Sequence, residues 1–187
     1  PGAHNVSNAL AVYALAKTLK ISVRHAYRTF KKYRGSWRRM EYRGKFRGAL
    51  VFDDYAHHPT EIIATLRAFK EKYPTKKLVC VFQPHQAERL KRLFEEFQTA
   101  FGLADETLVL PLYRVAGRDE KSSTFDSKNL VKTIQTKQRK KLIFYLGDPR
   151  NLRRAILALS KTTPLSKKII VMMGAGDIVD YTKKLLR

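Results

Sequence analysis

The sequence predicts an α/β fold, a Rossmann-like and mostly parallel sheet with helices on both faces. Short apolar runs alternate along most of the chain with stretches of helical periodicity, which is the pattern of parallel strands joined by crossover helices. The apolar runs are nearly continuous, as expected of strands that are buried on both faces. With 187 residues, the chain is long enough to enclose one substantial core.

The first part of the chain predicts two helices and a hairpin. Apolar residues recur at helical spacing over Val6–Leu19 and Val23–Tyr33. Two strands follow, over Trp37–Tyr42 and Lys45–Phe52. The turn signal between these two strands is Arg43-Gly44.

Regular alternation fills the rest of the chain. The hydrophobic pattern predicts a short closing helix and, before it, helices over 59–73, 87–101, 127–136 and 150–159. It predicts strands over 78–82, 107–112, 141–146 and 168–173. The polar segment 114–126 has no periodicity, and we expect it to be a surface loop that can move.

The formal net charge of +22 suggests nucleic-acid binding, because Lys and Arg side chains that neutralise phosphates dominate such binding. The positive charge is spread over almost every segment, however, and aromatic and basic residues interleave only around Tyr27–Arg43. A solvated basic surface is therefore the simpler interpretation. Cys80 is the only cysteine, no apolar run reaches the length of a membrane span, and the start shows no signal-peptide pattern. These features predict a cytoplasmic protein.

The densest group of titratable residues lies between a predicted strand and a predicted helix. The strand is the apolar run 49–52, and Pro59 and Glu61 suit the first turn of the helix. The polar residues between them are Asp53, Asp54, Tyr55, His57 and His58. Single residues of these types are usually helix caps or structural hydrogen-bonding groups. Because buried charge is costly unless it serves a purpose, the whole group together predicts a functional site.

Three predicted strands end in polar or glycine-rich segments. The segments are 54–58 (D-Y-A-H-H), 83–85 (Q-P-H) and 174–177 (G-A-G-D). Because parallel strands end at one edge of a sheet, where ligands bind in such folds, we expect the three segments to converge. Arg89 follows His85 by one helical turn and can share its side of the helix. The backbone N–H groups of the glycine-rich segment could bind an oxyanion, although tight turns explain such glycines equally well.

Several common catalytic motifs are absent from the sequence. It contains no G-x-x-x-x-G-K-[ST] phosphate loop and no G-x-G-x-x-G dinucleotide motif. His57 and His58 are adjacent, and neither C-x-x-C nor H-E-x-x-H occurs, so no metal site is predicted within this chain. The sequence also lacks the nucleophile elbow of serine hydrolases.

Several sequence blocks resemble the Mur ligase family of peptidoglycan synthesis. They are G-A-H-N-V-S-N-A-L-A (2–11), G-S-W-R-R-M-E (35–41), D-D-Y-A-H-H-P-T-E (53–61), F-Q-P-H-Q-A-E-R (82–89) and the ending M-G-A-G-D-I (173–178). The resemblance covers nearly the whole chain and is strongest to members that add L-alanine to UDP-N-acetylmuramate. It implies that residues 1–34 are the last helices of the family's central ATPase domain. Residues 35–187 would then be its Rossmann-like C-terminal domain.

The resemblance also implies roles for individual residues. The positions that bind ATP match His4, Asn5 and Asn8 at the adenine, Arg39 at the phosphates and Asp54 at the ribose. The region that receives the incoming amino acid matches Tyr55, His57, His85 and Arg89, with His57 and His85 as the implied catalytic residues. An arginine can bind a carboxylate through two parallel hydrogen bonds, and a neutral imidazole can take a proton from the ammonium of alanine.

The reaction implied by the resemblance forms an acyl phosphate from the muramoyl carboxylate and ATP, which the amino group of L-alanine then attacks. Such chemistry needs Mg²⁺, whose ligands we expect mostly in domains outside this chain, so the chain alone should be inactive. Gln86 stands where the alanine-adding members commonly carry a second arginine, and Ala3 stands where many carry arginine. A ligase that recycles murein tripeptide, another amino-acid-adding member and a basic nucleic-acid-binding module remain alternatives.

Overall fold

The computed structural model describes residues 3–33, 35–115, 117, 125–159 and 163–187. Its strands are β1 Glu41–Phe46, β2 Ala49–Asp54, β3 Lys77–Phe82, β4 Glu106–Val109, β5 Leu142–Tyr145 and β6 Lys168–Met173. They form a six-stranded sheet in the order β1-β2-β6-β3-β4-β5. β1 pairs antiparallel with β2, and the other neighbouring strands pair in parallel. The sequence-based prediction of a mostly parallel α/β sheet is therefore confirmed.

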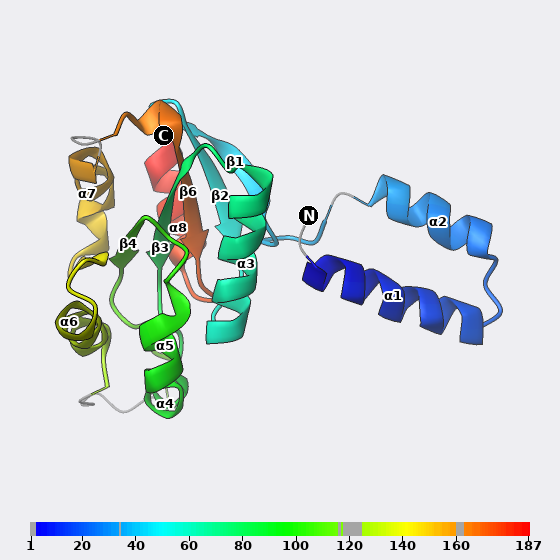
Figure 1. The fold of residues 1–187 in the computed structure, drawn as a ribbon, viewed down its shortest axis with the longest axis horizontal. Helices are drawn as coiled ribbons and strands as arrows, with labels where there is room; N and C mark the ends of the chain where they lie inside the picture. The colour runs from blue at the N-terminus through cyan, green and yellow to red at the C-terminus, as the bar shows by residue number, and fades with distance from the viewer. Residues whose placement is uncertain (1–2, 34, 116, 118–124, 160–162) are drawn as a thin grey trace.

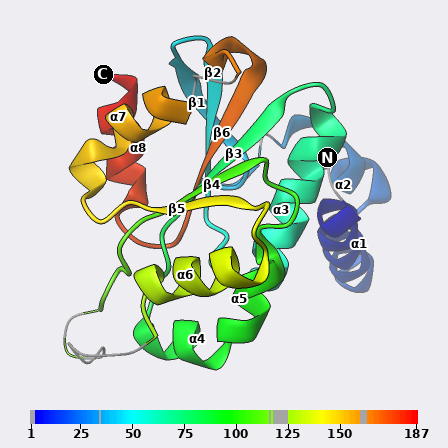
Figure 2. The same ribbon diagram turned by 60° about the vertical axis from the view of Figure 1, so that its left-hand side comes forward.

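Helices cover both faces of this sheet (Figures 1 and 2). The helices are α1 Ala3–Thr18, α2 Val23–Lys32, α3 Pro59–Lys72, α4 Ala87–Arg92, α5 Phe94–Ala100, α6 Ser127–Lys137, α7 Leu152–Ala158 and α8 Ile178–Leu186, with short 3₁₀ turns η1 Pro149–Asn151 and η3 Leu165–Lys167. Apolar residues of α3, α4, α5 and α6 form one core cluster with the sheet. Residues of α7 and α8 form a second cluster on the other face. The sheet is thus buried on both sides, which explains its nearly continuous apolar runs.

The β1–β2 hairpin turns at Arg47-Gly48, so the prediction of a turn at Arg43-Gly44 was wrong. Arg47 and Gly48 have φ of 48° and 87°, as a two-residue hairpin turn of this hand requires. Gly44 lies within β1 instead, where the register with β2 shifts between Tyr42 and Gly44. The dipeptide Arg-Gly occurs at both places, and the pattern of apolar residues did not distinguish the turn from the irregular strand.

Two further predictions of elements were wrong in detail. Residues 37–40 form a turn and not the start of a strand, and Arg38 and Met40 have positive φ there. The predicted helix 87–101 is interrupted at Leu93, which leaves helical geometry at φ −111° and ψ 24°. Leu90 and Phe97 belong to the same core cluster and are seven residues apart, which is also the spacing of two turns in a continuous helix. The periodicity of apolar residues therefore gave no sign of the interruption.

Helices α1 and α2 pack on each other and project away from the sheet (Figure 1). Their contact buries Ala16 and Ala26. Val6, Leu10 and Leu15 of α1 are exposed to 59–62%, as is Leu19 directly after this helix. The described residues include no helix with the length and apolar character needed to cross a membrane. The predicted loop 114–126 falls largely outside the described residues.

Candidate active site at the strand ends

The three polar strand ends converge, as the sequence predicted. β6 lies between β2 and β3, so Asp54, Met173 and Phe82 are neighbours at the carboxyl edge of the sheet. Hydrogen bonds continue this pairing beyond the strands. The Gly174 N–H donates to the Asp54 carbonyl oxygen at 3.1 Å, and the Gln83 N–H donates to the Met173 carbonyl oxygen at 2.9 Å.

Tyr55, His57, His85 and Arg89 come together at this edge. The ring centroids of Tyr55 and His57 are 5.3 Å apart, and those of His57 and His85 are 6.3 Å apart. Nη1 of Arg89 lies 3.3 Å from the carbonyl oxygen of His85 and 3.5 Å from its Nδ1. All four side chains are partly exposed. We refer to these four residues as the edge cluster.

The first turn of α3 sets the protonation site of His57. Nδ1 of His57 lies 2.9 Å from the Tyr55 carbonyl oxygen and 3.4 Å from Oε2 of Glu61. Both neighbours accept hydrogen bonds, so Nδ1 carries the proton. In neutral His57 the lone pair is therefore on Nε2, which makes Nε2 the atom able to accept a proton from a substrate.

Glu61 holds this turn in place through the capping box of α3. Its carboxylate accepts hydrogen bonds from the N–H groups of His57 at 3.0 Å and His58 at 3.2 Å, while His58 is the N-cap. Burial pushes the pKa of Glu61 upward, but the two N–H donors and the nearby His57 outweigh it, and the net pKa is lowered. A carboxylate thus stays ionised next to His57.

His85 is held by Tyr113, a residue that the sequence analysis did not identify. The two rings stack at 5.3 Å with an interplanar angle of 8°. The Tyr113 N–H donates to the Pro84 carbonyl oxygen at 2.8 Å, and its own carbonyl oxygen accepts from the Gln86 N–H at 3.1 Å. Tyr113 follows β4, which is the next strand after β3 in the sheet. Tyr113 lies close to His85 because β4 is next to β3 in the sheet, and this order of strands could not be predicted from the sequence alone.

Asp53 and Asp54 are buried and bonded within the protein. Asp54 is 2% exposed, and its carboxylate accepts from the N–H of Met40 at 2.8 Å, the N–H of Ala56 at 2.9 Å and the Thr65 hydroxyl at 3.2 Å. Asp53 accepts from the Thr182 hydroxyl at 2.5 Å. Burial raises the pKa of both carboxyl groups. These contacts tie the hairpin, α3 and α8 together, and contact of Asp54 with a ribose stays a prediction.

The glycines of the 174–176 segment permit close packing. A Cβ on Gly174 would lie 2.8 Å from the Gln83 carbonyl oxygen, and one on Gly176 would lie 2.6 Å from the Tyr113 ring. The Gly174 N–H is bonded to the Asp54 carbonyl oxygen, so within this segment oxyanion binding by backbone N–H groups stays a prediction for residues 175–177 only. The carbonyl oxygens of Gly174 and Gly176 instead accept hydrogen bonds from the Arg38 guanidinium. No sequence pattern indicated that Arg38 belongs to the site.

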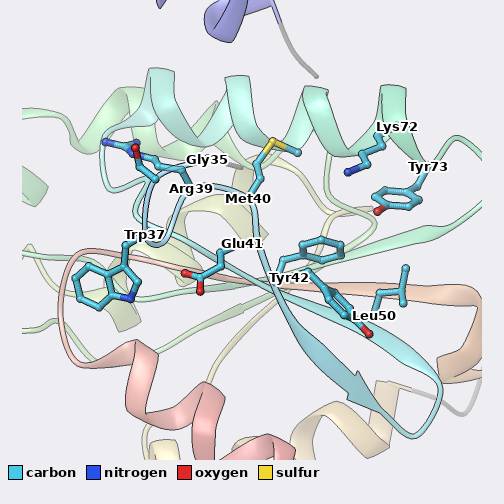
Figure 3. A pocket seen from close by; sticks show the side chains of 11 residues that line it. Gly35, Trp37, Arg39, Met40, Glu41, Tyr42, Leu50, Lys72 and Tyr73 are labelled. Atoms are coloured by element: carbon cyan, nitrogen blue, oxygen red, sulfur yellow. The ribbon is translucent and has the colours of Figure 1, made fainter. Parts of the chain in front are cut away.

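A pocket of about 760 Å³ lies between the β1–β2 hairpin and α3. Figure 3 shows Arg39 and Trp37 at one end of it and Lys72 and Tyr73 at the other. Arg39 is exposed, and its guanidinium carbon lies 5.6 Å from the centre of the Tyr55 ring. Arg39 therefore stands between this pocket and the edge cluster.

The other residues matched to ATP binding lie on α1. Asn5 and Asn8 are exposed on that helix, which stands apart from the sheet (Figure 1). Of His4 only the backbone, in the first turn of α1, belongs to the described part of the structure. Within the described residues, no three His, Cys, Asp or Glu side chains are grouped as they would be around a metal ion.

The fold is that of an α/β domain, and the edge cluster is a candidate ligand site at the carboxyl edge of its sheet. Residues 38–176 match the family described as Mur ligase, glutamate ligase domain. The chain therefore belongs to the Mur ligase family, and its sheet is the C-terminal domain of such a ligase.

Individual relatives agree with this assignment. The UDP-N-acetylmuramate–L-alanine ligase of Caldanaerobacter subterraneus is 36% identical over 186 residues, which are 100% of this chain and 38% of that protein. The solved UDP-N-acetylmuramate-alanine ligase of Thermotoga maritima superposes with a TM-score of 0.74 at 28% identity, over 100% of this chain and 37% of its own. A murein peptide ligase from Psychrobacter arcticus gives a TM-score of 0.74 at 26% identity with the same coverage. The chain thus spans less than two fifths of these relatives.

Proposed function

We propose that the chain is the C-terminal part of an ATP-dependent ligase that joins L-alanine to UDP-N-acetylmuramate. The observation that carries this proposal is the edge cluster of Tyr55, His57, His85 and Arg89. It combines a cation that can bind a carboxylate with imidazoles that can accept a proton. An amino acid that reacts through its amine presents a carboxylate for the cation and an ammonium proton for an imidazole. Similarity to an alanine ligase along the whole chain supports the choice of substrate.

Within the edge cluster, each residue has a role in the proposed reaction. Arg89 binds the carboxylate of the amino acid. The ammonium group must lose a proton before its nitrogen can attack the acyl phosphate. Nε2 of His57 is the ring nitrogen available to accept that proton, because Nδ1 is held by Tyr55 and Glu61. His85 lies beside His57 and is the alternative acceptor. Tyr55 forms the wall of the site next to His57.

ATP supplies the phosphoryl group that activates the muramoyl carboxylate. The exposed Arg39 suits a role at its phosphates, because an arginine fork matches phosphate oxygens. In the same proposal His4, Asn5 and Asn8 contact the adenine and Asp54 the ribose. The ligands of Mg²⁺ would come from outside this chain, because the described residues offer no group of metal ligands.

Residues 1–34 are proposed to belong to the preceding ATP-binding domain and residues 35–187 to the C-terminal domain. The exposure of Val6, Leu10 and Leu15 on α1, and of Leu19 just after it, supports this division. Several large apolar side chains exposed to water on one helix are unfavourable unless another part of the protein covers them. The C-terminal sheet does not cover these side chains, since α1 and α2 project away from it (Figure 1).

The second candidate is a ligase that takes a murein peptide as the acceptor of the acyl group. The superposition on a murein peptide ligase is as good as that on an alanine ligase, and Gln86 departs from the alanine-adding pattern. The test is ADP release by the full-length protein with UDP-N-acetylmuramate and ATP, comparing L-alanine with L-alanyl-γ-D-glutamyl-meso-diaminopimelate. We expect turnover with L-alanine. Turnover with the tripeptide alone would establish the second candidate.

A further inference from the structure

We propose that Arg38 is a positioning residue that fixes the edge cluster by joining the 174–176 segment to Tyr55. The identity of the substrate rests on the proposed function, whereas the contacts of Arg38 do not. Arg38 is 3% exposed, so it acts through other residues and does not itself reach a ligand. Burying a guanidinium costs free energy unless its charge is compensated and its N–H groups donate hydrogen bonds. The contacts of Arg38 should therefore explain why it is buried at this position.

The guanidinium of Arg38 bridges two segments that are distant in the sequence. Nη1 donates to the Gly176 carbonyl oxygen at 3.3 Å, and Nη2 donates to the Gly174 carbonyl oxygen. The same guanidinium lies over the Tyr55 ring, with its carbon 5.2 Å from the ring centroid. Asp53, Asp54 and Asp180 surround it and favour its charged form, while burial lowers its pKa. The segment after β6 and the residue after β2 are therefore held to a single side chain.

The backbone of Arg38 is fixed as firmly as its side chain. It has φ of 54°, a region that residues other than glycine seldom occupy. Its N–H donates to Oε2 of Glu41 at 2.8 Å, and its carbonyl oxygen accepts from the Tyr55 N–H at 2.6 Å. The turn 37–40 thus presents the guanidinium from one defined direction.

From Arg38 two series of contacts lead to the edge cluster and meet there. One passes from Tyr55 to His57, at 5.3 Å between ring centroids. The other passes from Gly176 to the Tyr113 ring that packs against it, and from Tyr113 to His85, on which that ring stacks. His57 and His85 then face each other at 6.3 Å. Arg38 is the residue that closes this ring of contacts at the side opposite the histidines.

The geometry requires arginine and not merely a positive charge. Two carbonyl oxygens are bound through two different nitrogens while the planar group lies over an aromatic ring. The ammonium of a lysine is a compact charge that cannot reproduce this fork. We therefore expect Arg38→Lys to behave like Arg38→Ala.

Arg43 offers a matched control on the same hairpin. It pairs with Oε1 of Glu41 at 2.8 Å and with Oδ2 of Asp53 at 3.3 Å. Both of these partners belong to the β1–β2 hairpin, and neither is Tyr55 or a residue of the 174–176 segment. Arg43→Ala removes an arginine and its ion pairs from the same hairpin. It therefore controls for any general loss of stability in Arg38→Ala that does not depend on the contacts of Arg38.

The first experiment measures amide hydrogen exchange by mass spectrometry in the full-length protein. In Arg38→Ala and Arg38→Lys we expect exchange in peptides spanning 173–178 to be roughly ten-fold faster than in the wild type, because the segment loses its anchor. Peptides spanning 173–178 in Arg43→Ala should exchange as in the wild type. Equal protection of this segment in Arg38→Ala and the wild type would overturn the proposal.

The second experiment is steady-state kinetics of the same proteins, varying the amino acid and ATP in turn. We expect kcat/KM for the amino acid to fall roughly ten- to a hundred-fold in Arg38→Ala, as for a misplaced binding group, with the KM for ATP almost unchanged. An equal loss in Arg43→Ala, or an equal rise in the KM for ATP, would overturn the positioning role. If the wild type used no amino acid, the proposed function would fail, and hydrogen exchange would decide on Arg38 by itself.

Discussion

Glu61 shows how a single carboxylate can define a catalytic candidate without touching a substrate. It accepts the N–H groups of His57 and His58 and lies 3.4 Å from Nδ1 of His57. Its pKa is lowered in the folded protein, so its stabilising contribution is present above its unfolded pKa of about 4.3. That contribution disappears as the pH falls through the lowered value.

We expect Glu61→Gln to lower the free energy of unfolding by about 1 kcal/mol at neutral pH, which is the usual contribution of a helix cap. The loss should not be larger, because water partly screens the charge of Glu61. A glutamine can still occupy the capping box, so the loss reports on the charge. The difference between the two proteins should begin to shrink as the pH falls below about 4.3, and it should vanish below the lowered pKa, where Glu61 is neutral in the folded protein as well. Chemical unfolding at neutral and acidic pH measures it. A difference that is the same at both pH values would contradict the role of charge.

Arg89 is the residue in the edge cluster with the most specific expected effect. Its Nη1 lies near His85, and no arginine stands at position 86 to share the binding of a carboxylate. We expect Arg89→Ala in the full-length protein to raise the KM for the amino acid roughly ten- to a hundred-fold, from a loss of about 1.5–3 kcal/mol for a charged hydrogen bond. The KM for ATP should hardly change.

The double variant of Arg89→Ala and Gln86→Arg provides the control. If both positions face one carboxylate, the arginine introduced at position 86 should recover part of the lost affinity. Steady-state kinetics on both single variants and the double variant decides this. An amino-acid KM that stays at the wild-type value in Arg89→Ala would show that α4 does not contact the amino acid.

At the scale of elements, the β1–β2 hairpin is the clearest case in which the structure corrected the sequence pattern. The turn is at Arg47-Gly48, and Arg47 has φ of 48° without being glycine, asparagine or aspartate. We expect Arg47→Asn to stabilise the protein by about 0.5–1 kcal/mol, because Asn-Gly is strongly preferred in this type of turn. The measurement is the midpoint of thermal unfolding.

Arg43→Asn is the matched comparison for that experiment. It places the same dipeptide where the sequence pattern had suggested the turn, but it removes the ion pairs of Arg43 with Glu41 and Asp53. We expect this variant to be less stable than the wild type. Stabilisation by Arg43→Asn and not by Arg47→Asn would mean that the hairpin turns at the earlier position.

For the molecule as a whole, the main point is that this chain contains only part of the proposed ligase. It spans 38% of an alanine ligase relative, and its sequence has no phosphate loop. We expect the purified chain to hydrolyse no ATP and to ligate nothing, because its sequence lacks the loop that binds the β- and γ-phosphates. Phosphate release in the presence of all substrates is the measurement. Turnover above that of a heat-inactivated sample would contradict the prediction.

Much of the edge cluster was predictable because its residues lie close to strand ends in the sequence. The apolar runs before Asp54 and Gln83 identified β2 and β3, and the parallel arrangement implied that their ends meet at one edge. The spacing of Arg89 from His85 by one helical turn was likewise enough to place them together, and Nη1 of Arg89 lies 3.3 Å from the His85 carbonyl oxygen. Local pattern suffices where neighbouring residues in the chain make the contact.

The sequence alone was enough to predict the fold class, the positions of most helices and strands, and the edge at which Tyr55, His57 and His85 meet. Three features became apparent only in the folded chain: Tyr113 stacks on His85, the carbonyl oxygens of Gly174 and Gly176 accept hydrogen bonds from Arg38, and Asp54 is buried. Local periodicity follows from which side of a strand or helix is buried, and it is encoded within a few residues. The contact between Arg38 and Gly174 spans 136 positions and depends on β6 inserting between β2 and β3, an order that no short stretch of sequence encodes.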